Sequence, residues 1–204
     1  MNERRRPPPD ITPEQFFSTW LPGEFTRLAG AAGFPDLRVR VELLGDGVRP
    51  EAGTWELVSA AGKLTVGPPD PSRRPLVTLA LSVPDWRAVM VGEEGPVSLM
   101  PPNASPTDLL FVDAASQQLL ATMTGTFRFE VRGYQGRTWQ LWASFGEPRK
   151  DPADAVIATD AATYAALLAR TLAVPEAYFT GKITMTGDAG RGMQVGLALL
   201  PKLR

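Results

Sequence analysis

The side chains that most often carry enzyme chemistry are missing from this sequence. Its 204 residues include no histidine and no cysteine, which removes the commonest general base and the thiolate nucleophile. A Ser-His-Asp triad and a His- or Cys-based metal site are therefore excluded. Carboxylates, lysine and serine remain, but no spacing among them marks a catalytic pair. We expect a protein that is not an enzyme, with carboxylate or lysine chemistry as the weaker alternative.

Two polar clusters partly match known ligand-binding loops. The run Gly187-Asp-Ala-Gly-Arg-Gly192 lies between a strand-like and a helix-like stretch, where an anion can bind. Its glycine order reverses the dinucleotide pattern and Asp188 would repel an anion, so a turn with Asp188 as helix cap is favoured. Asp151, Asp154 and Asp160 are near one another without the spacing of a metal-binding loop. We therefore expect no metal and no cofactor.

Composition and charge narrow the classes of partner. The chain is 44% hydrophobic and 21% charged with a formal net charge of −1, which is ordinary for a globular protein and gives no basis for binding nucleic acid. No apolar run approaches the roughly 20 residues that cross a bilayer, and Arg4-Arg5-Arg6 precedes no signal-like apolar segment. A soluble, cytoplasmic protein is expected. The three arginines leave transient membrane contact open, and the oligomeric state is not predicted.

The pattern that organises the chain lies in its last third. Residues 180–186 alternate, with Ile183 and Met185 on one side, which predicts a half-buried strand. Asp188 can cap a helix that begins directly after it. Apolar residues then recur along that helix at helical spacing, namely Ala189, Met193, Leu197 and Leu200.

This segment resembles the closing part of sterol carrier protein-2-like domains. The residues that carry the resemblance are Phe179-Thr-Gly-Lys-Ile-Thr-Met-Thr-Gly-Asp188 and Met193-Gln-Val-Gly196. The family has an aromatic residue, Ser/Thr-Gly-Lys, an alternating strand, Gly-Asp, and a helix with Met and Leu. The resemblance implies a twisted sheet with helices on one side and an apolar tunnel between the layers. It also implies binding of sterols or fatty acyl chains.

The resemblance further implies where a ligand lies, over Ile183 and Met185. Thr180, Lys182 and Gln194 are candidates for the polar mouth of the tunnel. Periodicity does not show whether the space is hollow, so ordinary core packing is an equal alternative for each apolar residue. The residues placed at the ligand are Phe127, Phe129, Leu141, Tyr164, Leu167, Leu168, Phe179, Ile183, Met185, Met193 and Leu197.

Two residue types favour a ligand site at the final helix. Met185 and Met193 are flexible and polarisable, which suits a variable apolar ligand. Gly190, Gly192 and Gly196 each cost about 0.5–1 kcal/mol in a helix relative to alanine. That cost indicates either close approach of the helix to the sheet or a lid that yields to a ligand.

Four pairs of segments recur along the chain in the same order. Each series contains a helix start, an alternating strand, a Trp-bearing strand and a strand that ends at a helix cap. We interpret this as a diverged tandem duplication, in which the first copy lacks the closing helix and the copies pack as an internal pseudo-dimer. The pairs are Thr12-Pro13 with Ser105-Pro106, Val39–Glu42 with Phe127–Glu130, Thr54–Leu57 with Thr138–Leu141, and Val77–Ser82 with Ala155–Asp160.

These observations predict an α+β fold with a twisted, mainly antiparallel sheet and helices on one face, duplicated along the chain. The predicted domains are a disordered tail at 1–10, an abbreviated unit at 11–104 and a complete unit at 105–204. The predicted function is non-catalytic binding or transfer of a fatty acid, fatty acyl chain or sterol-like lipid. The alternative is a protein–protein interaction module with a filled core, whose exposed tryptophans bind the partner; these are Trp20, Trp55, Trp86 and Trp142.

Overall fold

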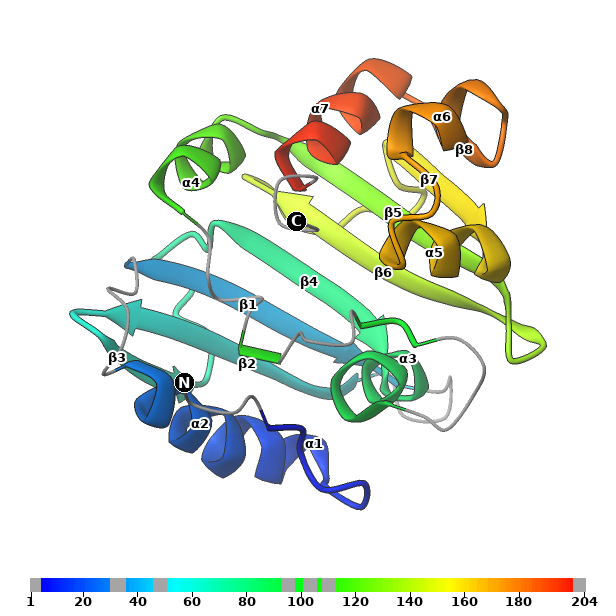
Figure 1. Cartoon of the computed structure of the whole chain (residues 1–204). Coiled ribbons are helices and arrows are strands. Elements are labelled where there is room, and N and C mark those ends of the chain that lie inside the picture. The colour runs from blue at the N-terminus through cyan, green and yellow to red at the C-terminus, as the bar shows by residue number, and fades with distance from the viewer. Residues whose placement is uncertain are drawn as a thin grey trace.

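A single mixed sheet forms the framework of the protein (Figure 1). The computed structural model describes residues 5–29, 36–45, 51–92, 98–100, 106–107 and 113–199, without the side chains of 29, 51 and 196–199. The strand order in this part of the chain is β3-β2-β1-β4-β6-β5-β7-β8. The strands are β1 Leu37–Leu44, β2 Glu51–Ala60, β3 Lys63–Gly67, β4 Val77–Ser82, β5 Gly125–Tyr134, β6 Arg137–Phe145, β7 Ala155–Asp160 and β8 Ile183–Gly187.

Helices cover one face of this sheet (Figure 1). Two π-helical segments, Phe16–Trp20 and Ala88–Gly92, continue α1 and α3. Among the described residues, no helix is long and apolar enough to cross a membrane. The α-helices are α1 Pro13–Gln15, α2 Leu21–Ala29, α3 Val83–Arg87, α4 Ala114–Ala121, α5 Ala161–Leu168, α6 Val174–Phe179 and α7 Ala189–Leu199.

The two halves of the chain repeat one pattern of strand pairing. In the first half β1 pairs antiparallel with β2 and parallel with β4. In the second half β5 pairs antiparallel with β6 and parallel with β7. An antiparallel pairing of β4 with β6 joins the halves. The predicted α+β class with a mainly antiparallel sheet is confirmed, whereas the origin of the two halves by duplication stays a prediction.

The register of the strands agrees with one of the sequence matches and corrects another. Val39 lies opposite Val77 in the first half, and the matched residue Phe127 lies opposite Ala155 in the second. The Trp-bearing strands are not in the same register. Trp55 lies opposite Val41, but Trp139 lies opposite Val131, which is two residues further along its neighbour strand than the match requires.

Four predicted helix caps are present. The Gln15 N–H donates to Thr12 Oγ1 at 3.2 Å, and Gln15 Oε1 accepts from the Thr12 N–H at 3.0 Å, so α1 begins with a capping box. The other three caps follow strands and each accepts a backbone N–H three residues later. They are Ser82 on α3, Asp160 on α5 and Asp188 on α7, with donor–acceptor distances of 3.1, 2.8 and 3.0 Å.

The hydrophobic core is continuous across the two halves. One cluster contains Trp55 and Trp86 from the first half together with Phe127 and Val195 from the second. Trp86 is fully buried and Trp55 is 9% exposed, and Phe17 of the first helical segment stacks on Trp55 with ring centroids 4.5 Å apart. The alternative hypothesis needed these tryptophans on the surface, so its premise is wrong for both.

The face of the sheet away from the helices carries arginine–glutamate clusters. In the first half Glu56 pairs with Arg38 and with Arg40, the latter at 3.2 Å. In the second half Glu130 contacts Arg128 at 3.0 Å and Arg132 at 3.3 Å. Both glutamates are buried because the long arginine side chains lie over them. The sheet is therefore apolar on its helix side and charged on the other.

One predicted segment differs from the structure, one strand was not predicted, and two predictions fall largely outside the described residues. In place of a free tail, residues 5–10 lie against α3, where Arg87 donates to the carbonyl oxygens of Pro9 and Ile11. Strand β3 was not identified from the sequence. The boundary at 104/105 and the helix start expected after Ser105 fall largely outside the described residues.

Candidate functional site

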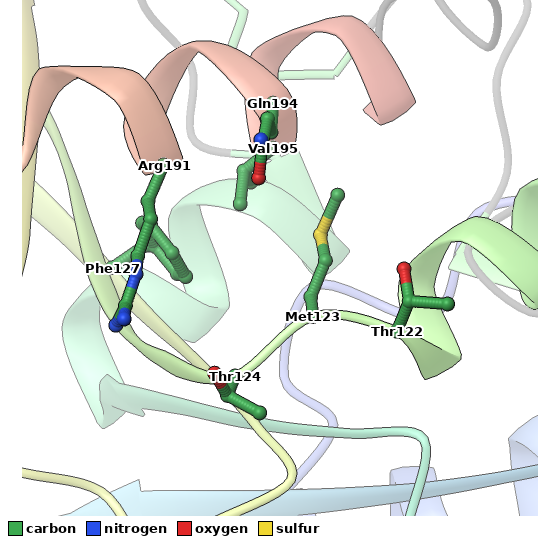
Figure 2. A pocket seen from close by; sticks show the side chains of 7 residues that line it. All are labelled: Thr122, Met123, Thr124, Phe127, Arg191, Gln194 and Val195. Atoms are coloured by element: carbon green, nitrogen blue, oxygen red, sulfur yellow. The ribbon is translucent and has the colours of Figure 1, made fainter.

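A pocket of about 220 Å³ lies beneath α7, where that helix faces the end of α4 and the start of β5 (Figure 2). We call it the α7 pocket. Figure 2 shows the Met123 side chain pointing toward α7. Its apolar walls come from two segments that are distant in sequence, residues 122–127 and α7. The described lining residues are Thr122, Met123, Thr124, Phe127, Arg191, Gln194 and Val195.

The short link between α4 and β5 positions one side of the α7 pocket. Asp113 caps the N-terminus of α4, and the helix ends in a tight turn in which the Met123 N–H donates to the Leu120 carbonyl oxygen at 3.1 Å. Gly146, with a φ of +68°, lies close to the Met123 carbonyl. Met123 itself is 8% exposed, so its thioether forms an inner wall of the pocket.

Asp154 ties together the strand and the helix that form the other side of the pocket. The Thr126 N–H of β5 donates to Asp154 Oδ2 at 2.7 Å. The Asp188 N–H, directly before α7, donates to the Asp154 carbonyl oxygen at 2.9 Å. Because one residue is bonded to both elements, it fixes the distance between Phe127 on β5 and Val195 on α7.

The charged group at the α7 pocket is Arg191. Its Nε lies 3.3 Å from Asp188 Oδ2 in an exposed ion pair, and its guanidinium also lies close to Gly125 and Asp154. Arginine has five N–H donors, so the group can bind a carboxylate while it keeps its contact with Asp188. Thr122, Thr124 and Gln194 add uncharged polar groups to the lining.

The α7 pocket does not include Ile183 and Met185, over which the ligand was expected, and that expected position stays a prediction. Helix α7 packs directly on this part of the sheet, because a Cβ atom placed on Gly192 would lie 3.6 Å from Met185 Sδ and 3.8 Å from Ile157 Cγ1. These are ordinary van der Waals contacts, so Gly192 marks the close approach that was one of the two interpretations of the helix glycines. The pocket opens on the other flank of α7, toward α4.

The predicted ligand residues fall into five groups. Phe127 lines the α7 pocket, and Phe129 and Leu141 pack in the core between the two halves of the sheet. Phe179 is 84% exposed and Met193 is 42% exposed, so their predicted place between the layers is wrong. The side chain of Leu197 lies outside the described residues. The remaining five pack in the helix layer and at β8 without lining the α7 pocket: Tyr164, Leu167, Leu168, Ile183 and Met185.

Of the three polar residues predicted at the mouth of the tunnel, one lines the α7 pocket and two do not. Gln194 lines the pocket. Thr180 instead donates to the Glu176 carbonyl oxygen at 2.7 Å, which closes the end of α6. Lys182 is exposed, and its carbonyl oxygen accepts from Thr159. Sequence reasoning missed Thr122, Met123, Thr124 and Arg191 because they follow no apolar period and come together only in the folded chain.

A larger groove of about 630 Å³ lies on the other side of Met123. We call it the α4 groove. It runs between α4 and the first strands of the N-terminal half, and Met123 is also part of its lining. No pattern in the sequence predicts this groove, since its walls are more than seventy residues apart in places. Its lining includes Leu37, Arg38, Arg74, Leu76, Leu120 and Ala121.

The acidic residues that were weighed as metal ligands have structural roles. Hydrogen bonds from Thr163, first from its backbone N–H, hold the pKa of Asp160 below its ordinary value, as expected for a helix cap. Asp154 links β5 to α7 as described above. Within the described residues, no three His, Cys, Asp or Glu side chains are grouped as metal ligands require.

Comparison with known proteins supports the family recognised from the sequence. Residues 107–199 match the model of the SCP-2 sterol transfer family, so the resemblance of the C-terminal half to sterol carrier protein-2-like domains is confirmed. The α7 pocket lies entirely within this segment. No match is found among curated proteins.

Three solved structures show similarity to the chain. Sterol carrier protein 2 like 2 from Aedes aegypti is 21% identical over 41% of this chain and 85% of its own, with a TM-score of 0.29. Sterol carrier protein domain 2 of Helicoverpa armigera is 18% identical over 49% of this chain and 93% of its own, with a TM-score of 0.34. A sec-alkylsulfatase from Pseudomonas sp. is 15% identical over 92% of this chain and 16% of its own, with a TM-score of 0.20.

Proposed function

We propose that this protein binds and transfers an apolar ligand, namely a fatty acid, a fatty acyl chain or a sterol-like lipid. The observation that carries the proposal is a pocket between the helix layer and the sheet, inside the segment that matches the sterol transfer family. Met123, Phe127 and Val195 offer the ligand an apolar surface. The polar residues around them are suited to a head group.

Burial of a lipid chain supplies enough free energy for such binding. Each methylene removed from water contributes about 0.8 kcal/mol, so ten contribute roughly 8 kcal/mol before costs. Several kcal/mol are lost when the ligand loses its translational and internal freedom. Micromolar affinity therefore needs no covalent or charged contact, which fits a carrier that must also release its ligand.

Binding without catalysis is part of the proposal. The full sequence has neither histidine nor cysteine, and the charged group of the α7 pocket is an arginine, which stays protonated and does not act as a general base. The lining therefore contains hydrogen-bond donors and apolar surface. Such a lining holds a ligand in place and gives it no proton-transfer partner.

A pair of neighbouring substitutions on α7 tests the position of the ligand. Gln194→Trp places an indole in the α7 pocket, while Met193→Trp places the same group on the exposed flank of the helix. Displacement of a fluorescent fatty acid measures the affinity of each variant. We expect Gln194→Trp to weaken binding by about tenfold, equal to about 1.4 kcal/mol, and Met193→Trp to bind as the wild type does.

Native mass spectrometry of the freshly purified wild type gives a second readout, in which bound lipid appears as added mass. Equal affinity in both variants would show that the ligand lies elsewhere in the protein. A wild type that carries no lipid and takes up neither fatty acid nor sterol would contradict the proposed function itself.

A further inference from the structure

Met123 is the wall shared by the two pockets of this protein. Met123 belongs to the lining of the α7 pocket and also to that of the α4 groove. The residue lies in the link between α4 and β5, and its thioether points toward α7 (Figure 2). Methionine is unbranched and has three rotatable side-chain bonds. Such a side chain can change its rotamer with little cost to the backbone.

The sizes of the two spaces show why the connection matters. The α7 pocket, at about 220 Å³, is smaller than the roughly 300–1,000 Å³ of ordinary ligand sites. The α4 groove, at about 630 Å³, falls within that range. A long lipid chain thus exceeds the pocket beneath α7, and its nearest continuation is past Met123 into the groove.

The lining of the α7 pocket suits the polar head group of a lipid, and the lining of the α4 groove suits its aliphatic tail. Four of the seven described residues of the α7 pocket are polar, and one of them, Arg191, is cationic. The α4 groove offers a run of aliphatic surface from Leu37, Leu76 and Leu120. Its charged residues are already engaged: Asp36 accepts from the Ala61 N–H, Arg38 pairs with Glu56, and Arg74 donates to the Gly146 carbonyl oxygen.

We propose that the α7 pocket and the α4 groove form one site for a long-chain fatty acid. The carboxylate binds Arg191, the chain passes Met123, and its terminal methylenes lie in the α4 groove. This inference rests on the proposed function and adds to it the class of ligand and its direction. It also gives the first half of the chain a part in binding, because Leu37 and Leu76 belong to that half.

Chain length is the variable that tests this site. Wild-type protein is titrated with octanoate and with palmitate by calorimetry. We expect palmitate to bind at least about tenfold more tightly, since its extra methylenes each contribute about 0.8 kcal/mol when buried. Ala121→Trp fills the α4 groove from the end of α4. The affinity for palmitate should therefore fall by about tenfold, while the affinity for octanoate should stay within about twofold of the wild-type value.

Leu119→Trp is the matched control for the groove. Leu119 is on the same helix, is 45% exposed and does not line the groove, so this variant should bind both acids as the wild type does. Gln118→Trp lies on the groove and repeats the test if Ala121→Trp does not fold. Octanoate and palmitate of equal affinity, or unchanged palmitate binding in both groove variants, would overturn the shared site and leave the proposed function standing.

The head-group contact has its own test. Arg191→Gln removes the positive charge that faces the ligand, so palmitate should bind about tenfold more weakly, while methyl palmitate, which has no charge, should be unaffected. Equal weakening of acid and ester would overturn the assignment of Arg191. If no acid and no ester binds to the wild type, the proposed function fails together with this inference.

Discussion

At the scale of single residues, Tyr164 shows how the protein holds its middle segment in place. Its phenol donates to the Leu99 carbonyl oxygen at 2.8 Å. Burial raises the pKa of this phenol to about 12, because the charged phenolate would lose its water. Leu99 belongs to a second apolar cluster with Val131 and Trp139. The hydrogen bond therefore joins the chain that links the two halves to α5.

This buried contact predicts that the stability of the protein depends on pH through the ionisation of Tyr164. Its pKa in the folded protein lies above the value of about 10 in the unfolded chain. The contribution of Tyr164 to the free energy of unfolding is therefore complete below pH 10 and is lost as the pH rises to about 12. In Tyr164→Phe, urea denaturation should show about 1 kcal/mol lower stability at neutral pH and a smaller loss between pH 10 and 12. An equal alkaline loss in both proteins would contradict this assignment.

Residues whose role is set by their neighbours in sequence were predicted correctly, whereas several residues positioned by tertiary contacts were not. Thr12, Ser82, Asp160 and Asp188 cap helices as expected, since a cap bonds within three residues of itself. Phe179 was placed in the tunnel, but α6 ends at this residue and leaves it exposed. The alternating pattern of the strand that follows does not show whether an aromatic residue in the preceding turn is buried or exposed.

At the scale of elements, the junction of β8 with α7 depends on a single glycine. Gly187 has a φ of +81°, and a Cβ atom there would clash with the Asp154 carbonyl oxygen that accepts from the Asp188 N–H. Gly187→Ala should therefore lower the free energy of unfolding by about 1–3 kcal/mol, measured by urea denaturation. A variant as stable as the wild type would show that this turn adapts to a side chain.

The same substitution five residues later should have the opposite effect. A Cβ atom on Gly192 would lie 3.6 Å from Ala155 Cβ and from Met185 Sδ, which is normal packing distance. Alanine also forms helix more readily than glycine, by up to about 1 kcal/mol. We expect Gly192→Ala to raise the melting temperature. A clear decrease would mean that α7 needs still closer contact with the sheet, or must bend there.

Strand β3 was not predicted from the sequence, and the reason is local. Strand β3 is short, lies at the edge of the sheet and is only half-buried, so its apolar alternation is weak. The signal that identifies it is the turn before it, where Ala61 and Gly62 both have positive φ values of 48° and 74°. Two such residues are typical of a tight hairpin. In the sequence only Gly62 marks this turn, because alanine is not typical of positions with positive φ.

At the scale of the whole molecule, the two halves meet head to tail. The sheet is joined by β4 of the first half and β6 of the second. In the repeated pattern β4 corresponds to β7, and β2 corresponds to β6, so unlike strands meet. A two-fold arrangement would pair like strands, so the contact between the halves is head to tail, and a pseudo-dimer that arose by duplication stays a prediction. The sequence matches could predict related halves, but the contact between them depends on side chains that no repeat specifies.

The continuous core predicts that both halves unfold together. Trp86 is fully buried in the first half and belongs to the same cluster as Phe127 and Val195 of the second. Trp86→Ala should cost about 3–5 kcal/mol, and the loss should reach the second half. Hydrogen exchange followed by mass spectrometry is expected to show faster exchange in β5 and β7 as well as in β1 and β4. If exchange in β5 and β7 stays as slow as in the wild type, the halves are independent domains, and the α4 groove between them belongs to a weaker interface than this core implies.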